Sequence, residues 1–327
     1  MATGTVLITG TAGFIGYHLA EAMLAGGWRV VGYDNFNDYY DVRLKEARHR
    51  RLEARAGYRG VRADLCDGDA LRRLFGEEPF TQVIHLAAQA GVRYSLEHPM
   101  AYVRSNLEGF VNVLEAVRHA GVPRLIYASS SSVYGGNTKL PFSEGDSVDR
   151  PVSLYAATKK ANELMAHAYS HLYGMQTVGL RFFTVYGPWG RPDMAMWIFA
   201  DKIARGEPIP VFNHGEMRRD FTYVADVVKG ILGAVGAPDL GPCEVFNLGN
   251  HRSERLLDLI AAIERAVGRQ AVLQMLPMQP GDVPATYADI ELARRRLGFE
   301  PTTPISQGVP EFVRWFMDYT KETRAHA

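Results

Sequence analysis

The chain alternates short β-branched runs with amphipathic stretches over its first half, and this alternation constrains the fold more than any other feature. The runs TVLITG, WRVVGYD, YRGVRAD, TQVIHLAA, PRLIYASS and QTVGLRFF each have the pattern of a strand, with helical patterns between them. Strands separated by helices form a parallel sheet, and nearly continuous apolarity indicates strands that are covered on both faces. We therefore predict an α/β fold with a doubly wound parallel sheet of the Rossmann type.

The alternation weakens after RFFTVYGPWGRPDMA, where Pro and Gly become frequent and the pattern is typical of loops around short helices. We predict a first domain over residues 1–180 and a smaller C-terminal α/β substrate domain over residues 181–327. One strand-like run, CEVFNLGN at residues 243–250, is expected to rejoin the first sheet, so the boundary near residue 180 is soft. Helical patterns at residues 256–267 and 308–319 are expected to end the chain.

Charge and cysteine content narrow the classes of function. Lys and Arg total 36 against 36 Asp and Glu, so the chain has no cationic surplus with which to neutralise nucleic-acid phosphates. The densest basic run, RLKEARHRRLEAR at residues 43–55, contains glutamates and favours a solvated helix face. Cys66 and Cys243 lie far apart without a metal-ligand spacing, so we expect neither disulfides nor a metal site. With no leader pattern and no long apolar run, a cytoplasmic protein without a membrane span is expected.

A glycine-rich turn follows the first strand, where ITGTAGFIG places Gly10, Gly13 and Gly16 ahead of an amphipathic helix. Glycines permit a tight turn and close approach of the backbone to a pyrophosphate, while the helix N-terminus supplies N–H donors. Asp34 follows the second strand, where a carboxylate accepts hydrogen bonds from ribose hydroxyls and repels a 2′-phosphate. The order of strand, turn, helix, strand and acid predicts a dinucleotide site that prefers NAD to NADP.

Two further strand ends lie at the same edge of the expected sheet, namely Asp64 with Leu65 and the sequence HLAA that begins at His85. Both can reach a cofactor there, although an ordinary connection between a strand and a helix explains these residues equally well. We interpret His85 as a structural histidine, because neither a metal-spaced residue nor a nucleophile lies near it in the sequence.

The sequence YAATK places Tyr155 and Lys159 four residues apart, on one face of an expected helix. A free tyrosine has a pKa of about 10, so it is a poor base at neutral pH unless positive charge lies close. Lys159 and an oxidised nicotinamide ring would both favour the phenolate. The pair follows the dinucleotide turn and the serine-rich strand end YASSSSVYGG, and this context favours redox chemistry at a hydroxyl group.

These motifs resemble those of the extended short-chain dehydrogenase/reductases, in the group of NAD-dependent nucleotide-sugar epimerases and dehydratases, along nearly the whole chain. The resemblance implies that Tyr155 is the base, that Lys159 orients it, and that Ser130 hydrogen-bonds the same substrate hydroxyl. It also implies a homodimer through helices around residues 106–119 and 155–173. Besides the glycines and Asp34, the implied NAD contacts are Phe14, Ile15, Asn35, Asp64, Leu65, Leu86, Ala87, Ala88, Gln89, Asn106, Tyr155 and Lys159.

The four consecutive serines discriminate between members of this group. Related dehydratases read Thr-Asp-Glu-Val-Tyr-Gly here and UDP-glucuronate decarboxylases resemble Thr-Ser-Glu-Val-Tyr-Gly, whereas this chain carries Ser131 and Ser132 at the carboxylate positions. Without those carboxylates, no group is evident that would expel water or assist the loss of carbon dioxide. The resemblance therefore favours C4 epimerisation, in which the hydroxyl is oxidised to a ketone and reduced again from the other face.

The segments HLAAQAGVRYS, SSSSVYG and RFFTVYGPWGRPDMA together resemble UDP-glucuronate 4-epimerases, whereas UDP-galactose 4-epimerases carry a lysine at the position of Ala90. The implied substrate is a UDP-hexuronic acid, with UDP-glucuronic acid converted to UDP-galacturonic acid. Its 4-keto form is a β-keto acid that can decarboxylate, so the carboxylate must be held still. The implied substrate contacts are Ser130, Ser131, Ser132, Thr184 and Arg93 near the sugar, Arg191 and Arg219 near the diphosphate, Phe212 against uracil, and Asp282 near ribose.

Several alternatives stay open at this point. The chain could be a 4-epimerase of UDP-glucose or its N-acetyl derivative, a UDP-glucuronate decarboxylase, or a redox-sensing module that binds NAD without chemistry. The presence of both Tyr155 and Lys159 disfavours the last of these. A structural ion pair explains Arg93 about as well as substrate binding does, and relatives often carry an arginine near Gln279, which leaves diphosphate binding open.

Overall fold

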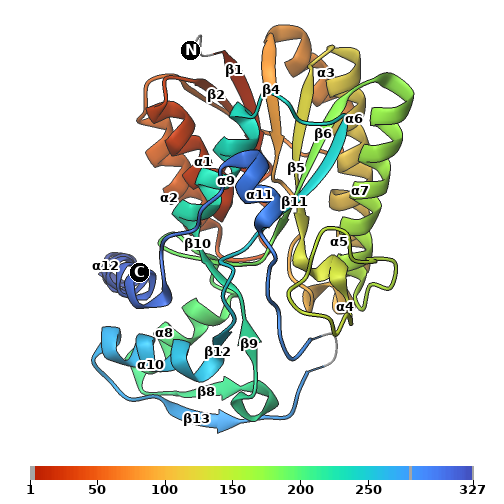
Figure 1. Ribbon diagram of the computed structural model, residues 1–327. Coiled ribbons are helices and arrows are strands. Elements are labelled where there is room, and N and C mark those ends of the chain that lie inside the picture. The colour runs from red at the N-terminus through yellow and green to blue at the C-terminus, as the bar shows by residue number, and fades with distance from the viewer. Residues whose placement is uncertain (1–3, 280–281, 326–327) are drawn as a thin grey trace.

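The computed structural model describes residues 4–279 and 282–325 and contains a seven-stranded parallel sheet in the order β11-β6-β5-β4-β1-β2-β3 (Figure 1). This arrangement confirms the expected α/β fold with a doubly wound parallel sheet. The strands are β1 (Thr5–Thr9), β2 (Arg29–Asp34), β3 (Tyr58–Arg62), β4 (Phe80–His85), β5 (Arg124–Ser130), β6 (Gln176–Phe182) and β11 (Cys243–Leu248).

Helices cover both faces of the sheet, because alternate side chains of each buried strand point to opposite faces. Val6 and Ile8 of β1 pack in one apolar core, and Leu7 packs in the other. The first core includes α1 (Phe14–Ala25), α9 (Val224–Gly236) and α11 (Glu291–Leu297), and the second includes α3 (Gly68–Glu77), α6 (Gly109–His119) and α7 (Leu154–Tyr173).

The run expected at residues 243–250 lies in the sheet as β11, where Cys243–Leu248 pair in parallel with Thr177–Phe182 of β6. Helices α9 and α11, which also follow residue 180 in the chain, cover one face of the same sheet. Three later segments therefore pack on the sheet that the first half of the chain builds.

A third apolar core lies beyond the carboxyl ends of the strands, where Figure 1 shows α8 (Ala195–Arg205), α10 (Leu256–Val267) and α12 (Ile305–Ala325). It is formed mainly by these three helices, so helices occur where the patterns at 256–267 and 308–319 predict them. Three two-stranded sheets form outside the main sheet: β7 (Thr184–Tyr186) with β10 (Phe221–Tyr223), β9 (Arg218–Arg219) with β12 (Glu254–Arg255), and β8 (Pro208–Val211) with β13 (Val272–Met275).

Short segments near the carboxyl ends of β4 and β5 complete the described chain. These are α4 (Tyr94–Glu97), α5 (Pro99–Tyr102), a π-helical turn (Val103–Glu108) and a 3-10 turn at Ser131–Tyr134. A further 3-10 turn, Phe212–Gly215, directly follows β8. The remaining helix, α2 (Val42–Glu53), connects β2 to β3. Within the described ranges, none of the helices combines the length and apolarity needed to cross a bilayer.

Candidate active site

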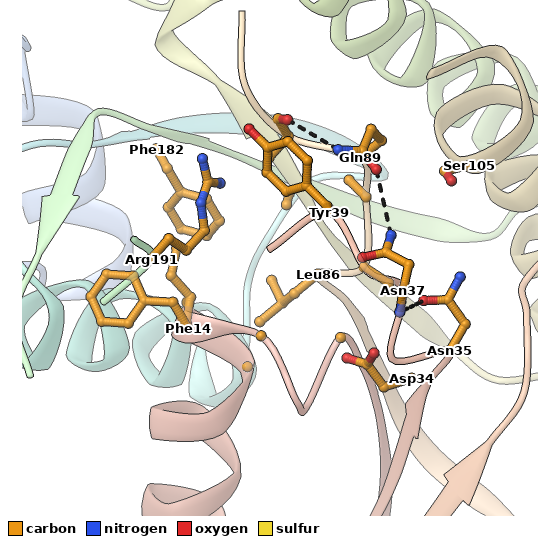
Figure 2. A pocket seen from close by; sticks show the side chains of 18 of the residues that line it. Phe14, Asp34, Asn35, Asn37, Tyr39, Leu86, Gln89, Ser105, Phe182 and Arg191 are labelled. Carbon is orange, nitrogen blue, oxygen red and sulfur yellow. Dashed lines mark hydrogen bonds between the residues drawn. The ribbon is translucent and has the colours of Figure 1, made fainter. Parts of the chain in front are cut away.

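A cavity of about 250 Å³ opens at the carboxyl ends of the central strands, between the two parts of the molecule. Figure 2 shows Phe14 and Arg191 on the opposite side of this cavity from Asp34 and Asn35. The sequence-predicted residues that line it are Gly10, Gly13, Phe14, Ile15, Gly16, Asp34, Asn35, Asp64, Leu65, Leu86, Ala87, Ala88, Gln89, Ser130, Tyr155, Lys159 and Arg191.

The turn between β1 and α1 requires glycine for steric reasons. Gly10 has a φ of +79°, and a Cβ there would lie 2.8 Å from the backbone nitrogen of Ala87. A Cβ at Gly16 would lie 2.1 Å from the carbonyl oxygen of Gly10, so α1 can approach the turn only without it. The first turn of α1 has neither a side-chain cap nor an acidic residue, which leaves its N–H groups for an anion. The turn therefore fits a dinucleotide diphosphate.

The Asp34 carboxylate is fixed at the end of β2. It accepts hydrogen bonds from the backbone nitrogen of Ala12 at 3.0 Å and from that of Phe36 at 2.9 Å. The neighbouring Asn35 amide donates to the Asp64 carboxylate at 2.8 Å, which joins the ends of β2 and β3. Both acids thus present oxygen atoms on the cavity wall in fixed positions.

Tyr155 and Lys159 lie in the first turns of α7, which Ser153 caps by accepting a hydrogen bond from Ala156. The buried ammonium of Lys159 donates to the carbonyl oxygen of Ala128 at 2.9 Å, which ties α7 to the end of β5. Burial lowers the pKa of Lys159 to about 8, because removal of water disfavours the ammonium.

The protonation of Tyr155 differs from the sequence-based expectation. Burial raises the pKa of the Tyr155 phenol, although a hydrogen bond with Ser130 and the charge of Arg191 partly offset this. Lys159 holds the strand carbonyl of Ala128 and does not by itself lower the pKa of the phenol. Ionisation of Tyr155 at neutral pH therefore needs further positive charge in the cavity.

The first two of the four serines make different hydrogen bonds at the end of β5. Ser129 points into the interior and donates to Glu163 at 2.6 Å. Ser130 lines the cavity, and its hydroxyl donates to that of Ser132 at 3.1 Å. Both residues line the cavity, and the Ser129 hydroxyl also belongs to a buried network with Glu163.

The cavity residues that the sequence did not predict include the polar residues Asn37, Tyr39 and Lys45. The Tyr39 hydroxyl donates to Asp193 at 3.0 Å, and Asp193 forms an ion pair with Arg191 at 2.6 Å. Asn37 and Tyr39 belong to the sequence NDYYD at residues 37–41, shortly after the end of β2. Its polar and aromatic residues are the signal that could have indicated a site, although periodicity does not place side chains in such a loop.

The basic run at residues 43–55 is not simply a solvated helix face, so that interpretation was wrong for part of it. Helix α2 buries Leu44, Lys45, Arg48 and Leu52. The Lys45 ammonium donates to two oxygen atoms of Asn37, at 2.5 and 2.6 Å, and burial lowers the pKa of Lys45 to about 8. Two cations therefore point inward because oxygen atoms of loops at the cavity solvate them.

Four predicted substrate residues meet outside this cavity, on segments far apart in the sequence. The Arg93 guanidinium lies 4.9 Å from the ring centroid of Phe212 and 3.4 Å from the Asp282 carboxylate. Burial lowers the pKa of Arg219, and the nearby Asp282 charge partly offsets this. The structure thus combines an aromatic face, two cations and a carboxylate in one cluster.

Ser131, Ser132, Thr184 and Asn106 are not among the residues that line the main cavity. Thr184 lines an adjoining space of about 40 Å³ that shares Arg191 with it. Asn106 lies behind the wall, where its side chain accepts from the Gln89 nitrogen at 2.8 Å and donates to the Gln89 oxygen at 3.0 Å. Its amide therefore holds the loop after β4 in place.

His85 is buried and hydrogen-bonded to the Thr9 hydroxyl at 2.8 Å. Burial lowers the pKa of His85 to about 3, so the ring is neutral in the physiological range. Its geometry agrees with the structural interpretation.

The chain is similar to known proteins over most of its length. UDP-glucuronate 4-epimerase 4 of Arabidopsis thaliana is 51% identical over 331 residues, covering 96% of this chain and 76% of that protein. A probable UDP-glucuronate 4-epimerase of Rhizobium meliloti is 47% identical, covering 95% of this chain and 96% of that protein. The crystal structure of UDP-glucuronic acid 4-epimerase from Bacillus cereus, in complex with UDP-glucuronic acid and NAD, is 34% identical with a TM-score of 0.92, covering 96% of this chain and 99% of that one. Residues 6–249 match the NAD dependent epimerase/dehydratase family, and the chain belongs to this family.

Proposed function

We propose that the protein is a UDP-glucuronate 4-epimerase that interconverts UDP-glucuronic acid and UDP-galacturonic acid with bound NAD. The observation that carries this proposal is the distribution of acids around the cavity. Among the described lining residues, the carboxylates are Asp34 and Asp64, at the ends of β2 and β3. The strands β4 and β1 separate them from Ser130 at the end of β5, so neither is positioned to expel water from a sugar beside Tyr155. The similar UDP-glucuronate 4-epimerases support the same choice of substrate.

In the proposed reaction, Tyr155 removes the proton of the C4 hydroxyl and later returns one to the C4 oxygen. Ser130 shares the hydrogen bond to that oxygen, and Lys159 fixes the start of α7 against β5 through Ala128. Bound NAD would supply the hydride acceptor and donor for C4, and its oxidised ring would add positive charge. That charge would favour the phenolate, which burial alone disfavours.

For the nucleotide we propose that uracil stacks on Phe212, with Asp282 near the ribose and Arg219 and Arg191 near the diphosphate. Arginine suits this task because its planar fork binds phosphate oxygens in pairs. Asp193 holds Arg191 in one orientation, and Tyr39 in turn holds Asp193.

For the carboxylate of the sugar we propose Ser131, Ser132 and Thr184 as neutral donors. Thr184 is the best placed of the three, because it lines a space that adjoins the main cavity. Neutral donors leave the carboxylate ionised and fix its orientation, which keeps the bond to carbon dioxide out of alignment with the C4 carbonyl.

Incubation of the purified protein with UDP-glucuronic acid tests the proposal, with products identified by proton NMR. We expect UDP-galacturonic acid as the main product without added reductant. A pentose product would show a decarboxylase instead, and turnover of UDP-galactose without turnover of UDP-glucuronic acid would show a different 4-epimerase.

Replacement of Asp34 by Asn is expected to reduce the preference for NAD over NADP by about tenfold or more. The variant keeps the size of the side chain but loses the charge that hydrogen-bonds ribose hydroxyls, and such bonds contribute about 1.5–3 kcal/mol. Calorimetric titration of NAD-depleted protein with each dinucleotide measures both affinities. An unchanged ratio would contradict the role of Asp34. Asp69→Asn is the matched control, because the Asp69 side chain is exposed on α3.

We propose that the protein is a homodimer through α7 and its neighbours. Leu164 and Leu172 on α7 are 58% and 65% exposed, and Tyr173 beside them is 49% exposed. Helices α4 and α5 pack against α7 and add Leu96 and Met100, at 59% and 64% exposure. Large exposed apolar side chains on helices that pack together are typical of a protein interface.

Leu172→Glu is expected to shift the protein from dimer to monomer in sedimentation velocity experiments, because the interface would bury two unpaired carboxylates. Met317→Glu on α12 is the control, since Met317 is exposed on a different part of the molecule. A wild-type protein that sediments as a monomer would contradict the proposal.

We also propose a cytoplasmic location, because Cys66 and Cys243 are free thiols, as is common in reducing compartments.

A further inference from the structure

Arg48 of α2 is a buried cation that the proposed chemistry does not use. Its side chain has no exposed surface, and no carboxylate pairs with it among the residues described. Its charge is solvated by oxygen atoms of the protein instead. A buried guanidinium without a counter-ion is costly, so its partners have to be well placed.

The guanidinium joins three segments that are distant in the sequence. One nitrogen donates to the carbonyl oxygen of Ala12 at 2.8 Å and to the Tyr40 hydroxyl at 2.7 Å. The other donates to the carbonyl oxygen of Trp189 at 2.6 Å and to that of Gly190 at 3.2 Å. Arg48 thus bridges the glycine turn after β1 and the loop that leads to α8.

Each end of this bridge is next to a ligand site. Ala12 lies between Gly10 and Gly13, and its N–H group donates to the carboxylate of Asp34. Gly190 directly precedes Arg191, whose side chain lines the cavity from the opposite side (Figure 2). The two sites therefore share one rigid connection.

The loop at the second end needs support to keep its shape. Trp189 has a φ of +60°, a left-handed conformation that residues with a Cβ adopt at a cost. Such a conformation persists where surrounding contacts determine it. Arg48 contacts the carbonyl of this residue and of the next one, so it fixes the direction in which the backbone enters Arg191.

We propose that Arg48 is a positioning residue that couples the binding of NAD to the binding of the nucleotide sugar. This inference rests on the proposed function, because it takes Arg191 as a contact of the substrate diphosphate. A diphosphate at Arg191 stabilises one position of the loop at 187–193, and the Arg48 guanidinium transmits that preference to the turn that holds NAD. The coupling is reciprocal, as binding linkage requires.

The experiment measures how fast NAD leaves the purified holoenzyme in the presence and absence of UDP. Released NAD is removed by dialysis, and the retained fraction is determined by chromatography of the denatured protein. UDP is a suitable probe because it carries the diphosphate without the sugar. Calorimetry on each variant first establishes that UDP binds.

The variants are Arg48→Lys and Arg48→Met, with Arg50→Met as the matched control. Lysine keeps the charge but lacks the planar fork that reaches four acceptors, and methionine removes both. Arg50 lies on the same helix and is exposed to solvent. If Arg48→Met does not fold, as judged by circular dichroism, Arg48→Lys carries the test.

In the wild type and in Arg50→Met, saturating UDP is expected to slow the loss of NAD by about fivefold or more. In the Arg48 variants the ratio of the two rates is expected to fall to about one, while UDP still binds. A merely structural role would change the melting temperature but leave this ratio as it is in the wild type.

Two results overturn the inference alone: a wild-type ratio of one despite UDP binding, or a wild-type ratio that persists in Arg48→Lys. Failure of UDP to bind the wild-type holoenzyme overturns the proposed function, and the coupling with it. The calorimetric arm therefore separates the two failures.

Discussion

Tyr155→Phe is expected to lower kcat by about 10²–10⁴-fold, the range that a positioned acid or base contributes. The substitution removes only the hydroxyl group that exchanges a proton with the C4 oxygen. The ring stays in its edge-to-face contact with Tyr102, at 6.0 Å between centroids, so the start of α7 is expected to remain in place. Product formation from UDP-glucuronic acid, followed by NMR, measures the loss.

The retained NAD content shows whether this loss is chemical. We expect the Tyr155→Phe variant to bind NAD in the same amount as the wild type, because the backbone of the glycine turn is unchanged. Tyr169→Phe is the matched control on the same helix, where the hydroxyl donates to Glu115 at 2.6 Å and lies outside the cavity. Turnover by Tyr155→Phe at the wild-type rate would exclude the phenol as the base.

Glu163→Gln is expected to lower the free energy of unfolding by about 3–5 kcal/mol, the usual cost of removing one partner of a buried ion pair. Two Arg181 nitrogens donate to the two Glu163 oxygens, each at 2.9 Å, and both side chains are at most 6% exposed. Glutamine fills the same space but leaves the Arg181 charge uncompensated. Ser129, which donates to the same carboxylate, loses a charged acceptor as well.

Urea denaturation measures this change, with the same dependence of the unfolding free energy on urea concentration used for the wild type and the variants. Glu115→Gln is the control, because Glu115 pairs with Arg118 at the surface, where such pairs contribute little. A loss for Glu163→Gln as small as that of the control would mean that water or a rearranged side chain replaces the missing charge.

The parts of the fold that were predictable from the sequence are those with a periodic pattern. Apolar runs located the seven strands, including β11, which is far from the others in the chain. The spacing of Tyr155 and Lys159 placed both at the cavity because a helix brings residues four apart to one face. Strand order and the carboxyl-end rule then located the cavity.

The parts that were not predictable depend on contacts between distant segments. Lys45 and Arg48 are charged, so the sequence predicts that they are exposed to solvent. Their hydrogen-bond partners are oxygen atoms of loops, and the hydrophobic pattern of the sequence does not determine where those loops lie. The alternation of Ser129 and Ser130 was visible in principle, yet the burial of Glu163 and Arg181 was needed to show which serine faces inward. The rise in the pKa of Tyr155 likewise results from burial, which the sequence does not show.

The return of the chain to the sheet through α9, β11 and α11 limits how this protein can be divided. A fragment that stopped at the end of β6, at residue 182, would leave this buried strand as an unprotected edge and one face of the sheet partly bare. The dinucleotide-binding part of this fold therefore cannot acquire a new substrate-binding domain by simple fusion at its C-terminal end. New specificities have to arise by changes in the loops, with the whole chain kept together.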